Sequence, residues 1–250
     1  MFYKGEKEMI LKADKTRITP TGVKINEYFL TQHNPNKIDM PGKRVKPLLG
    51  VTIHNTGPIN VRDTTMSEQY TRATYNGNMN SVRVHYYVDD TEAWQNLPLN
   101  YQGWHAADGN GDGNSSTIAI ECIMGGTAGY EKAEDNCARL AAHILLLNGL
   151  TTANLYTHTY WLNVRDGRGT DLNKDDRCTL AHPYKTCPAY IIPHWKEFVK
   201  KVDKYIIEQG QSSGTPKYYV QVGAFSNKAN AEKYLESVKK DYPDAFVKVM

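Results

Sequence analysis

Four side chains in this sequence have the types and positions needed for a catalytic metal centre. His54 ends an apolar run that is typical of a buried strand, and Glu121 interrupts another apolar run at 117–123. An isolated buried carboxylate costs several kcal/mol, so Glu121 is expected to pair with a cation or to lie beside a metal. His158, at another strand end, and Cys187 complete a set of three protein ligands with one open position, the ligand count of catalytic zinc.

Strands and helices are expected to alternate around these residues. Short apolar, β-branched runs predict strands at 48–54, 82–89, 92–97, 117–123 and 155–158. Apolar residues at helical spacing predict helices at about 63–77, 131–148 and 193–210. Because 82–89 and 92–97 are close enough to form an antiparallel hairpin, the predicted fold class is α/β with a mixed central sheet flanked by helices.

Composition and length indicate one main domain with a small appended module. The 250 residues, 40% of them hydrophobic, predict a catalytic domain at 1–210, a linker at 211–216 and a compact βαβ module at 217–250. Within this module we expect strands at 218–222 and 246–249 and a helix at 230–239. The net charge is only +3 and the basic residues are scattered, which argues against a nucleic-acid partner.

Neither a membrane-spanning segment nor a signal peptide is expected from the sequence. No run approaches the roughly 18 to 20 apolar residues that cross a bilayer, so no membrane insertion is expected. The first residues lack an apolar signal core, so we expect synthesis in the cytoplasm without a signal peptide, and reduced cysteines.

Six short motifs resemble those of the type 2 N-acetylmuramoyl-L-alanine amidases, a family that includes phage endolysins and the peptidoglycan recognition proteins. In chain order they are 51–57 (VTIHNTG), 84–89 (VHYYVD), 103–106 (GWHA), 118–121 (IAIE), 156–158 (YTH) and 185–188 (KTCP). The resemblance extends over about residues 25–207. It implies a zinc-dependent hydrolase that cuts the amide between the lactyl group of N-acetylmuramic acid and the first alanine of the peptidoglycan stem peptide.

The resemblance also implies a role for each candidate residue. His54, His158 and Cys187 would hold Zn²⁺, Glu121 would act as the general base and Lys185 would stabilise the oxyanion. Zinc and a nearby carboxylate suit amide hydrolysis, because the metal polarises the carbonyl and the carboxylate moves the proton.

Three further residues are candidates for substrate binding. His85 and His105 would line the substrate groove and Trp104 would stack on a sugar, although ordinary packing explains all three equally well. Some relatives carry a catalytic tyrosine where this chain has Val84, which leaves the proton transfer to Glu121.

One departure from the family leaves the third ligand open. The 26 residues 159–184 separate His158 from Lys185, where shorter family members have only a handful. This insertion contains Cys178 and His182, either of which is an alternative to Cys187. The intact Lys-x-Cys-Pro spacing favours Cys187.

The C-terminal module resembles the opening half of a SPOR domain, a family that binds peptidoglycan glycan strands. The motif lies at 218–226 (YYVQVGAFS) and 229–233 (ANAEK). A unit of this size buries little core, so we expect two chains to pair their half-modules into a homodimer. The alternative is a truncated relic that folds weakly.

Together these features predict a phage or prophage endolysin whose partner is bacterial peptidoglycan and which acts on the cell wall after release. The alternatives are a leaderless host autolysin, a non-catalytic peptidoglycan-binding module and a zinc hydrolase of small muropeptides. Neither a zinc deaminase nor a His-Glu-x-x-His metalloprotease signature occurs in the sequence.

Overall fold

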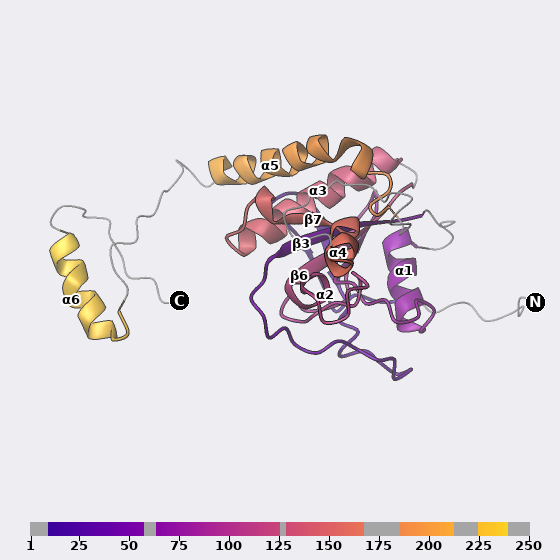
Figure 1. The fold of residues 1–250 in the computed structure, drawn as a ribbon, viewed down its shortest axis with the longest axis horizontal. Coiled ribbons are helices and arrows are strands. Elements are labelled where there is room, and N and C mark those ends of the chain that lie inside the picture. Colours follow the sequence, from indigo (N-terminus) through magenta and orange to yellow (C-terminus); the bar gives the residue numbers. More distant parts are fainter. Residues whose placement is uncertain (1–9, 58–63, 126–128, 168–185, 213–224, 240–250) are drawn as a thin grey trace, which may run out of the picture. The chain divides into compact units, whose positions relative to one another are not determined.

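A mixed sheet of seven strands organises the first of two units, Met1–Ser212, in the computed structural model of the chain (Figure 1). The structure describes residues 10–57, 64–125, 129–167, 186–212 and 225–239. The strands are β1 (Lys15–Ile18), β2 (Lys24–Glu27), β3 (Gly50–Thr56), β4 (Tyr86–Val88), β5 (Ala93–Gln95), β6 (Thr117–Ile123) and β7 (Leu155–Thr157). Their order is β1-β2-β5-β4-β6-β3-β7, and the predicted α/β class with a mixed sheet is confirmed.

The centre of the sheet is parallel, and its register aligns the candidate residues. β4, β6, β3 and β7 run parallel, whereas β4 and β5 form the predicted antiparallel hairpin. His54 on β3 lies opposite Glu121 on β6, which lies opposite Tyr87 on β4. Because successive side chains alternate between faces, these three residues share one face of the sheet.

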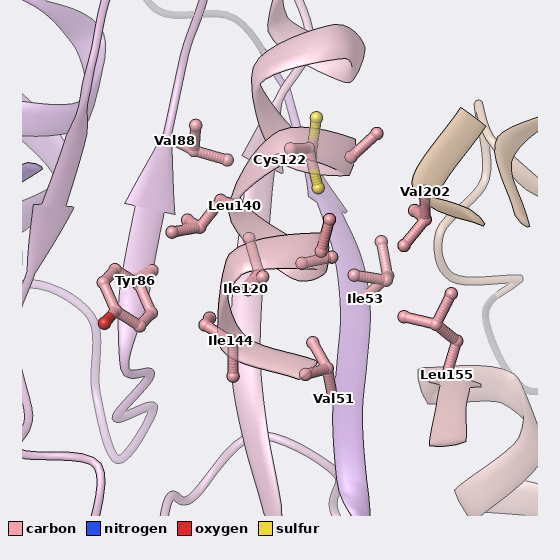
Figure 2. Close-up of a cluster of buried hydrophobic side chains, with 14 of the residues drawn as sticks. Val51, Ile53, Tyr86, Val88, Ile120, Cys122, Leu140, Ile144, Leu155 and Val202 are labelled. Atoms are coloured by element: carbon pink, nitrogen blue, oxygen red, sulfur yellow. The ribbon is translucent and has the colours of Figure 1, made fainter. Parts of the chain in front are cut away.

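The other face of the sheet carries the main core. α3 (Tyr130–Leu147) packs on it, and α5 (Trp195–Ser212) packs on α3 (Figure 1). Alternate residues of the central strands meet α3 there, with Val202 of α5 nearby (Figure 2). The fully buried strand side chains of this cluster include Val51, Ile53, Ile118 and Ile120. Cys122 and Cys137 are free buried thiols in the same cluster.

Ion pairs and a short 3-10 helix hold the two helices of this layer together. The 3-10 helix Ile192–His194 leads into α5. Glu134 on α3 is 4% exposed and lies 2.6 Å from His194 Nε2 and 2.7 Å from Lys201 Nζ. The predicted helices at 131–148 and 193–210 therefore exist and pack as a pair.

The face that carries His54 is covered by three shorter helices: α1 (Met66–Tyr75), α2 (Asp112–Ser116) and α4 (His158–Arg165). α4 was not predicted, because the sequence reads as an insertion from residue 159 onward. The Thr157 hydroxyl caps this helix by accepting the Tyr160 N–H at 3.0 Å. Trp161 Nε1 then donates to Thr52 Oγ1 at 2.8 Å, which fixes α4 to β3.

The second unit, Ser213–Met250, is described from 225 to 239. It contains α6 (Lys228–Val238), capped by the Asn227 side chain, at the position of the expected helix. The expected strands at 218–222 and 246–249 lie outside the described residues. α5 runs to Ser212, so the first two residues of the predicted linker 211–216 belong to that helix. Among the described residues, none of the helices has the length and apolar character needed to span a membrane.

Candidate metal centre

His54, His158 and Cys187 converge beneath the surface of the first unit. They are 1%, 3% and 4% exposed, and their potential ligand atoms all lie within 4.8 Å of one another. Cys187 Sγ is 3.7 Å from His54 Nδ1. Two ligands of a tetrahedral zinc ion, with bonds of about 2.1 and 2.3 Å, are about 3.5 Å apart. Two imidazoles and a thiolate are also typical zinc donors, so these residues fit the ion that the sequence predicts.

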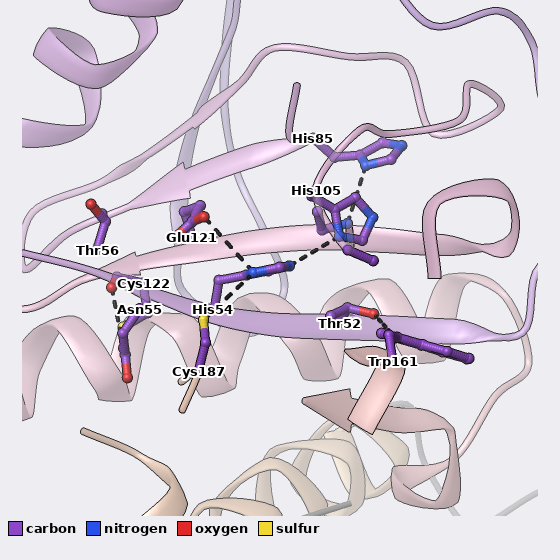
Figure 3. A network of polar contacts seen from close by, with 12 residues as sticks. Thr52, His54, Asn55, Thr56, His85, His105, Glu121, Cys122, Trp161 and Cys187 are labelled. Carbon is purple, nitrogen blue, oxygen red and sulfur yellow. Dashed lines mark hydrogen bonds and ion pairs between the residues drawn. The ribbon is translucent and has the colours of Figure 1, made fainter. Parts of the chain in front are cut away.

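Glu121 shares the sheet face of His54 and lies near His54 and Cys187 (Figure 3). Its Oε1 atom is 3.9 Å from His54 Nδ1, and 14% of its side chain is exposed. The carboxylate therefore combines proximity to the metal donors with access to solvent. A group that transfers protons between water and a substrate needs both properties.

Cys187 is held near the histidines by a pair of hydrogen bonds with Thr159, the residue after His158. We call this pair of bonds the clasp. The Thr159 N–H donates to the Cys187 carbonyl at 3.0 Å, and the Cys187 N–H donates to Thr159 Oγ1 at 2.8 Å. Thr159 is fully buried. These bonds join the start of α4, where His158 directly follows β7, to the segment of Cys187 that follows the insertion.

A second contact holds the same segment from the β3 side. The Tyr190 N–H donates to Asn55 Oδ1 at 3.0 Å, and Asn55 directly follows His54. Neither Asn55 nor Thr159 is predicted from the sequence to have a role at the site. Two features of the sequence could have indicated them: each directly follows a predicted ligand, and each has a side chain that can accept a hydrogen bond from a backbone N–H group.

His105 lies against the opposite side of the His54 ring. His105 Nδ1 is 3.0 Å from His54 Nε2, and the two ring planes meet at 88° with centroids 5.0 Å apart. Burial, followed by the nearby His85 and His158, lowers the pKa of His105 well below its usual value. The neutral ring of His105 therefore contacts a predicted metal ligand directly.

A cavity of about 410 Å³ opens beside the cluster. Its lining includes His158 and two of the predicted substrate-binding residues, Trp104 and His105, together with the apolar side chains of Val82 and Leu162. Trp104 is half-buried. The cavity thus gives a ligand access to the edge of the metal centre.

His85, the third predicted substrate-binding residue, is fully buried and is not among the residues that line this cavity. Its Nε2–H donates to the Tyr101 carbonyl at 3.1 Å, and its Nδ1 accepts the Ala119 N–H at 3.1 Å. Burial lowers the pKa of His85 to about 4. With both ring nitrogens bonded to the backbone, His85 links β4 to β6 and to the loop at Tyr101.

Three residues of the sequence hypothesis cannot be placed. Lys185, the predicted oxyanion stabiliser, lies outside the described residues, as do the alternative ligands Cys178 and His182. The structure does bring Cys187 to the two histidines.

Comparison with known proteins points to one family for most of the chain. A model of the N-acetylmuramoyl-L-alanine amidase family matches residues 44–189, and a model of the SPOR domain matches residues 214–250. A solved structure described as a mutant endolysin from Bacillus subtilis is 28% identical, with a TM-score of 0.54. The match covers 72% of this chain and 99% of that one.

Two curated proteins of Bacillus subtilis are similar to this chain over part of their length. The N-acetylmuramoyl-L-alanine amidase XlyA is 30% identical over 178 residues, which are 69% of this chain and 51% of XlyA. The N-acetylmuramoyl-L-alanine amidase CwlH is 28% identical over 181 residues, which are 72% of this chain and 61% of CwlH. The chain therefore spans less than two thirds of either relative.

The clasp predicts that the Thr159 hydroxyl is needed to hold Cys187. Thr159→Val keeps the shape of the side chain but leaves the buried Cys187 N–H without its acceptor, so the unfolding free energy should fall by roughly 1–3 kcal/mol. Zinc affinity should fall by about 10- to 100-fold. Urea unfolding in chelator and zinc titration measure the two effects. Thr159→Ser, which keeps the hydroxyl, is the control, and equal losses in both variants would contradict the prediction.

The burial of His85 predicts a loss of stability in mild acid. The unfolded ring gains a proton near pH 6.5, but the folded ring stays neutral down to about pH 4, so the unfolded state binds more protons between these values. This difference should remove about 2 kcal/mol of stability at pH 5 relative to pH 7. His85→Gln does not titrate. Between pH 7 and pH 5 its free energy of unfolding, measured in urea, should therefore fall by about 2 kcal/mol less than that of the wild type. An equally steep loss in both proteins would contradict this role.

Proposed function

The chain belongs to the N-acetylmuramoyl-L-alanine amidase family, and we propose that it hydrolyses the amide between the lactyl group of N-acetylmuramic acid and L-alanine in peptidoglycan. The observation that carries this proposal is the buried set of His54, His158 and Cys187 with Glu121 beside it, at the edge of a cavity of about 410 Å³. The names of the similar proteins XlyA and CwlH support the same reaction.

The three ligands would hold Zn²⁺, which supplies a Lewis acid for the scissile carbonyl and lowers the pKa of a water molecule towards roughly 7. Glu121 takes the proton of the attacking water as the new C–O bond forms. It then gives that proton to the alanine nitrogen as the C–N bond breaks. The position of its carboxylate, 3.9 Å from His54 Nδ1 and 14% exposed, suits this transfer. Lys185 is proposed to stabilise the negative oxygen, because it lies two residues before Cys187.

Glu121→Gln should lower kcat by about 10²- to 10⁴-fold, because the amide cannot accept the proton. Zinc affinity should change little, since Glu121 is not a ligand. Mass spectrometry of digested peptidoglycan should show stem peptides with a free N-terminal alanine from the wild-type chain, and chelation should abolish them.

Glu131→Gln provides the matched control, because Glu131 is an exposed carboxylate at the start of α3. Its activity should equal that of the wild type. New reducing sugars in place of free alanine termini would indicate a glycosidase and contradict the proposal. Intact peptidoglycan with tight binding would instead indicate a non-catalytic wall-binding module.

We further propose that the C-terminal unit binds peptidoglycan glycan strands and pairs two chains into a homodimer. The SPOR match over 214–250 supports wall binding. On α6, Ala231, Leu235 and Val238 are half-buried and stand four and three residues apart, so they form one apolar stripe on a helix with no buried residue.

A chain that dimerises through this unit should be a dimer by light scattering, whereas a truncation after Ser212 should be a monomer. Leu235→Glu should also give a monomer, because it places a charge in the apolar stripe. Ser237→Glu adds the same charge at an exposed position and should leave the dimer intact. A monomeric full chain at micromolar concentration would contradict dimerisation.

We also propose that the protein acts as an endolysin that reaches the wall only after release from the cytoplasm. The structural match described as an endolysin supports this role. Bacteria that express the chain should lyse only when a pore-forming protein is expressed with it. Lysis without the pore-former, followed as culture turbidity, would contradict the need for release.

A further inference from the structure

We propose that His105 is a positioning residue that fixes the tautomer of His54, and with it the atom that His54 offers to the metal. This inference rests on the proposed metal centre and assigns a role to the Gly-Trp-His-Ala motif at 103–106. The proposal rests on the contact between His54 Nε2 and His105 Nδ1, which are 3.0 Å apart, in residues that are 1% and 6% exposed.

The two nitrogens of His54 face different partners. Nδ1 lies 3.7 Å from Cys187 Sγ and 3.9 Å from Glu121 Oε1, so it is the atom on the metal side. A neutral imidazole carries one N–H, and Nδ1 can bind a metal only when that proton is on Nε2. A buried N–H needs an acceptor. His105 Nδ1 supplies this acceptor and thereby favours the tautomer that binds metal.

His105 is itself held by a rigid loop. Asn114 Oδ1 accepts the backbone N–H groups of His105 and Ala106 at 2.7 and 2.8 Å. Asn114 is fixed in turn, because its Nδ2 donates to the Gly109 carbonyl at 2.9 Å and its N–H donates to Asp108 Oδ1 at 3.2 Å. The backbone that carries the His105 ring is therefore held by the Asn114 side chain.

Gly103 provides the space in which this ring lies. A Cβ atom at Gly103 would be 2.6 Å from His105 Cδ2, which is closer than real carbon contacts allow. The glycine and the histidine of the motif thus belong to one arrangement. Through His105 Nδ1, this arrangement contacts Nε2 of His54.

Zinc affinity separates this role from substrate binding, because His105 also lines the cavity. His105→Phe keeps a ring but removes the acceptor. His105→Asn places an oxygen at the same bond separation from the backbone as Nδ1. His143→Phe is the matched control, since His143 is a buried histidine on α3, across the sheet from His54. Each full-length chain is titrated with Zn²⁺ against a chromophoric chelator, and circular dichroism verifies folding.

We expect His105→Phe to weaken zinc binding by about 10- to 100-fold and His105→Asn by less than about tenfold. His143→Phe should bind zinc as the wild type does. Wild-type zinc affinity in His105→Phe, with a raised KM for a soluble muropeptide, would overturn the proposal and make His105 a substrate contact. Equal losses in the Asn and Phe variants would overturn it as well, because the acceptor would then be irrelevant.

A second measurement decides the question if His105→Phe does not fold. In ¹⁵N imidazole NMR spectra of the zinc-loaded wild type, a proton on Nε2 of His54 supports the proposal and a proton on Nδ1 overturns it. A wild-type chain that binds no zinc would overturn the proposed function together with this inference. Tight zinc binding by both the wild type and His105→Phe would overturn the inference alone.

Discussion

Two imidazoles and one thiol are buried with their potential ligand atoms within 4.8 Å of one another, and the surrounding structure must hold these polar groups in place. Polar groups taken out of water are stable only when something bonds them. Part of that bonding comes from the protein itself, because the His105 ring contacts the His54 ring and Thr159 hydrogen-bonds the backbone of Cys187. A divalent ion would add further bonds to these three side chains. The cluster that the protein must hold together is therefore also the one suited to binding a catalytic metal.

The parallel sheet meets this constraint by separating its two faces. Val51 and Ile53 point to the core under α3, so the residues between and after them, Thr52 and His54, point to the site. The register that places His54 opposite Glu121 then brings the carboxylate proposed to transfer protons beside a proposed metal ligand. Packing against α3 and the proposed catalysis therefore use alternate residues of the same strands.

The long segment between His158 and Lys185 is compatible with this geometry because its two ends are joined locally. Thr159 bonds Cys187, and Asn55 bonds Tyr190, so the ligands on both sides of the segment are fixed at its base. The entropic cost of closing a loop grows slowly with its length. Extra residues beyond the clasp therefore do not need to disturb the proposed metal centre.

Hydrophobic periodicity is a local property, so the strand 117–123 and the helices near α3 and α5 could be predicted from the residues alone. The sequence also pointed to His54 and His158, but it left Cys178 and His182 as alternatives to Cys187, which the folded chain brings to the two histidines. It did not predict α4 or the short strands β1 and β2, whose few buried residues leave little pattern. The folded chain, in contrast, shows that His85 bonds the backbone while His105 bonds His54, and that Thr159 holds Cys187. Those contacts join residues 16 to 51 positions apart, and which nitrogen faces which partner depends on the folded sheet and loops that bring them together.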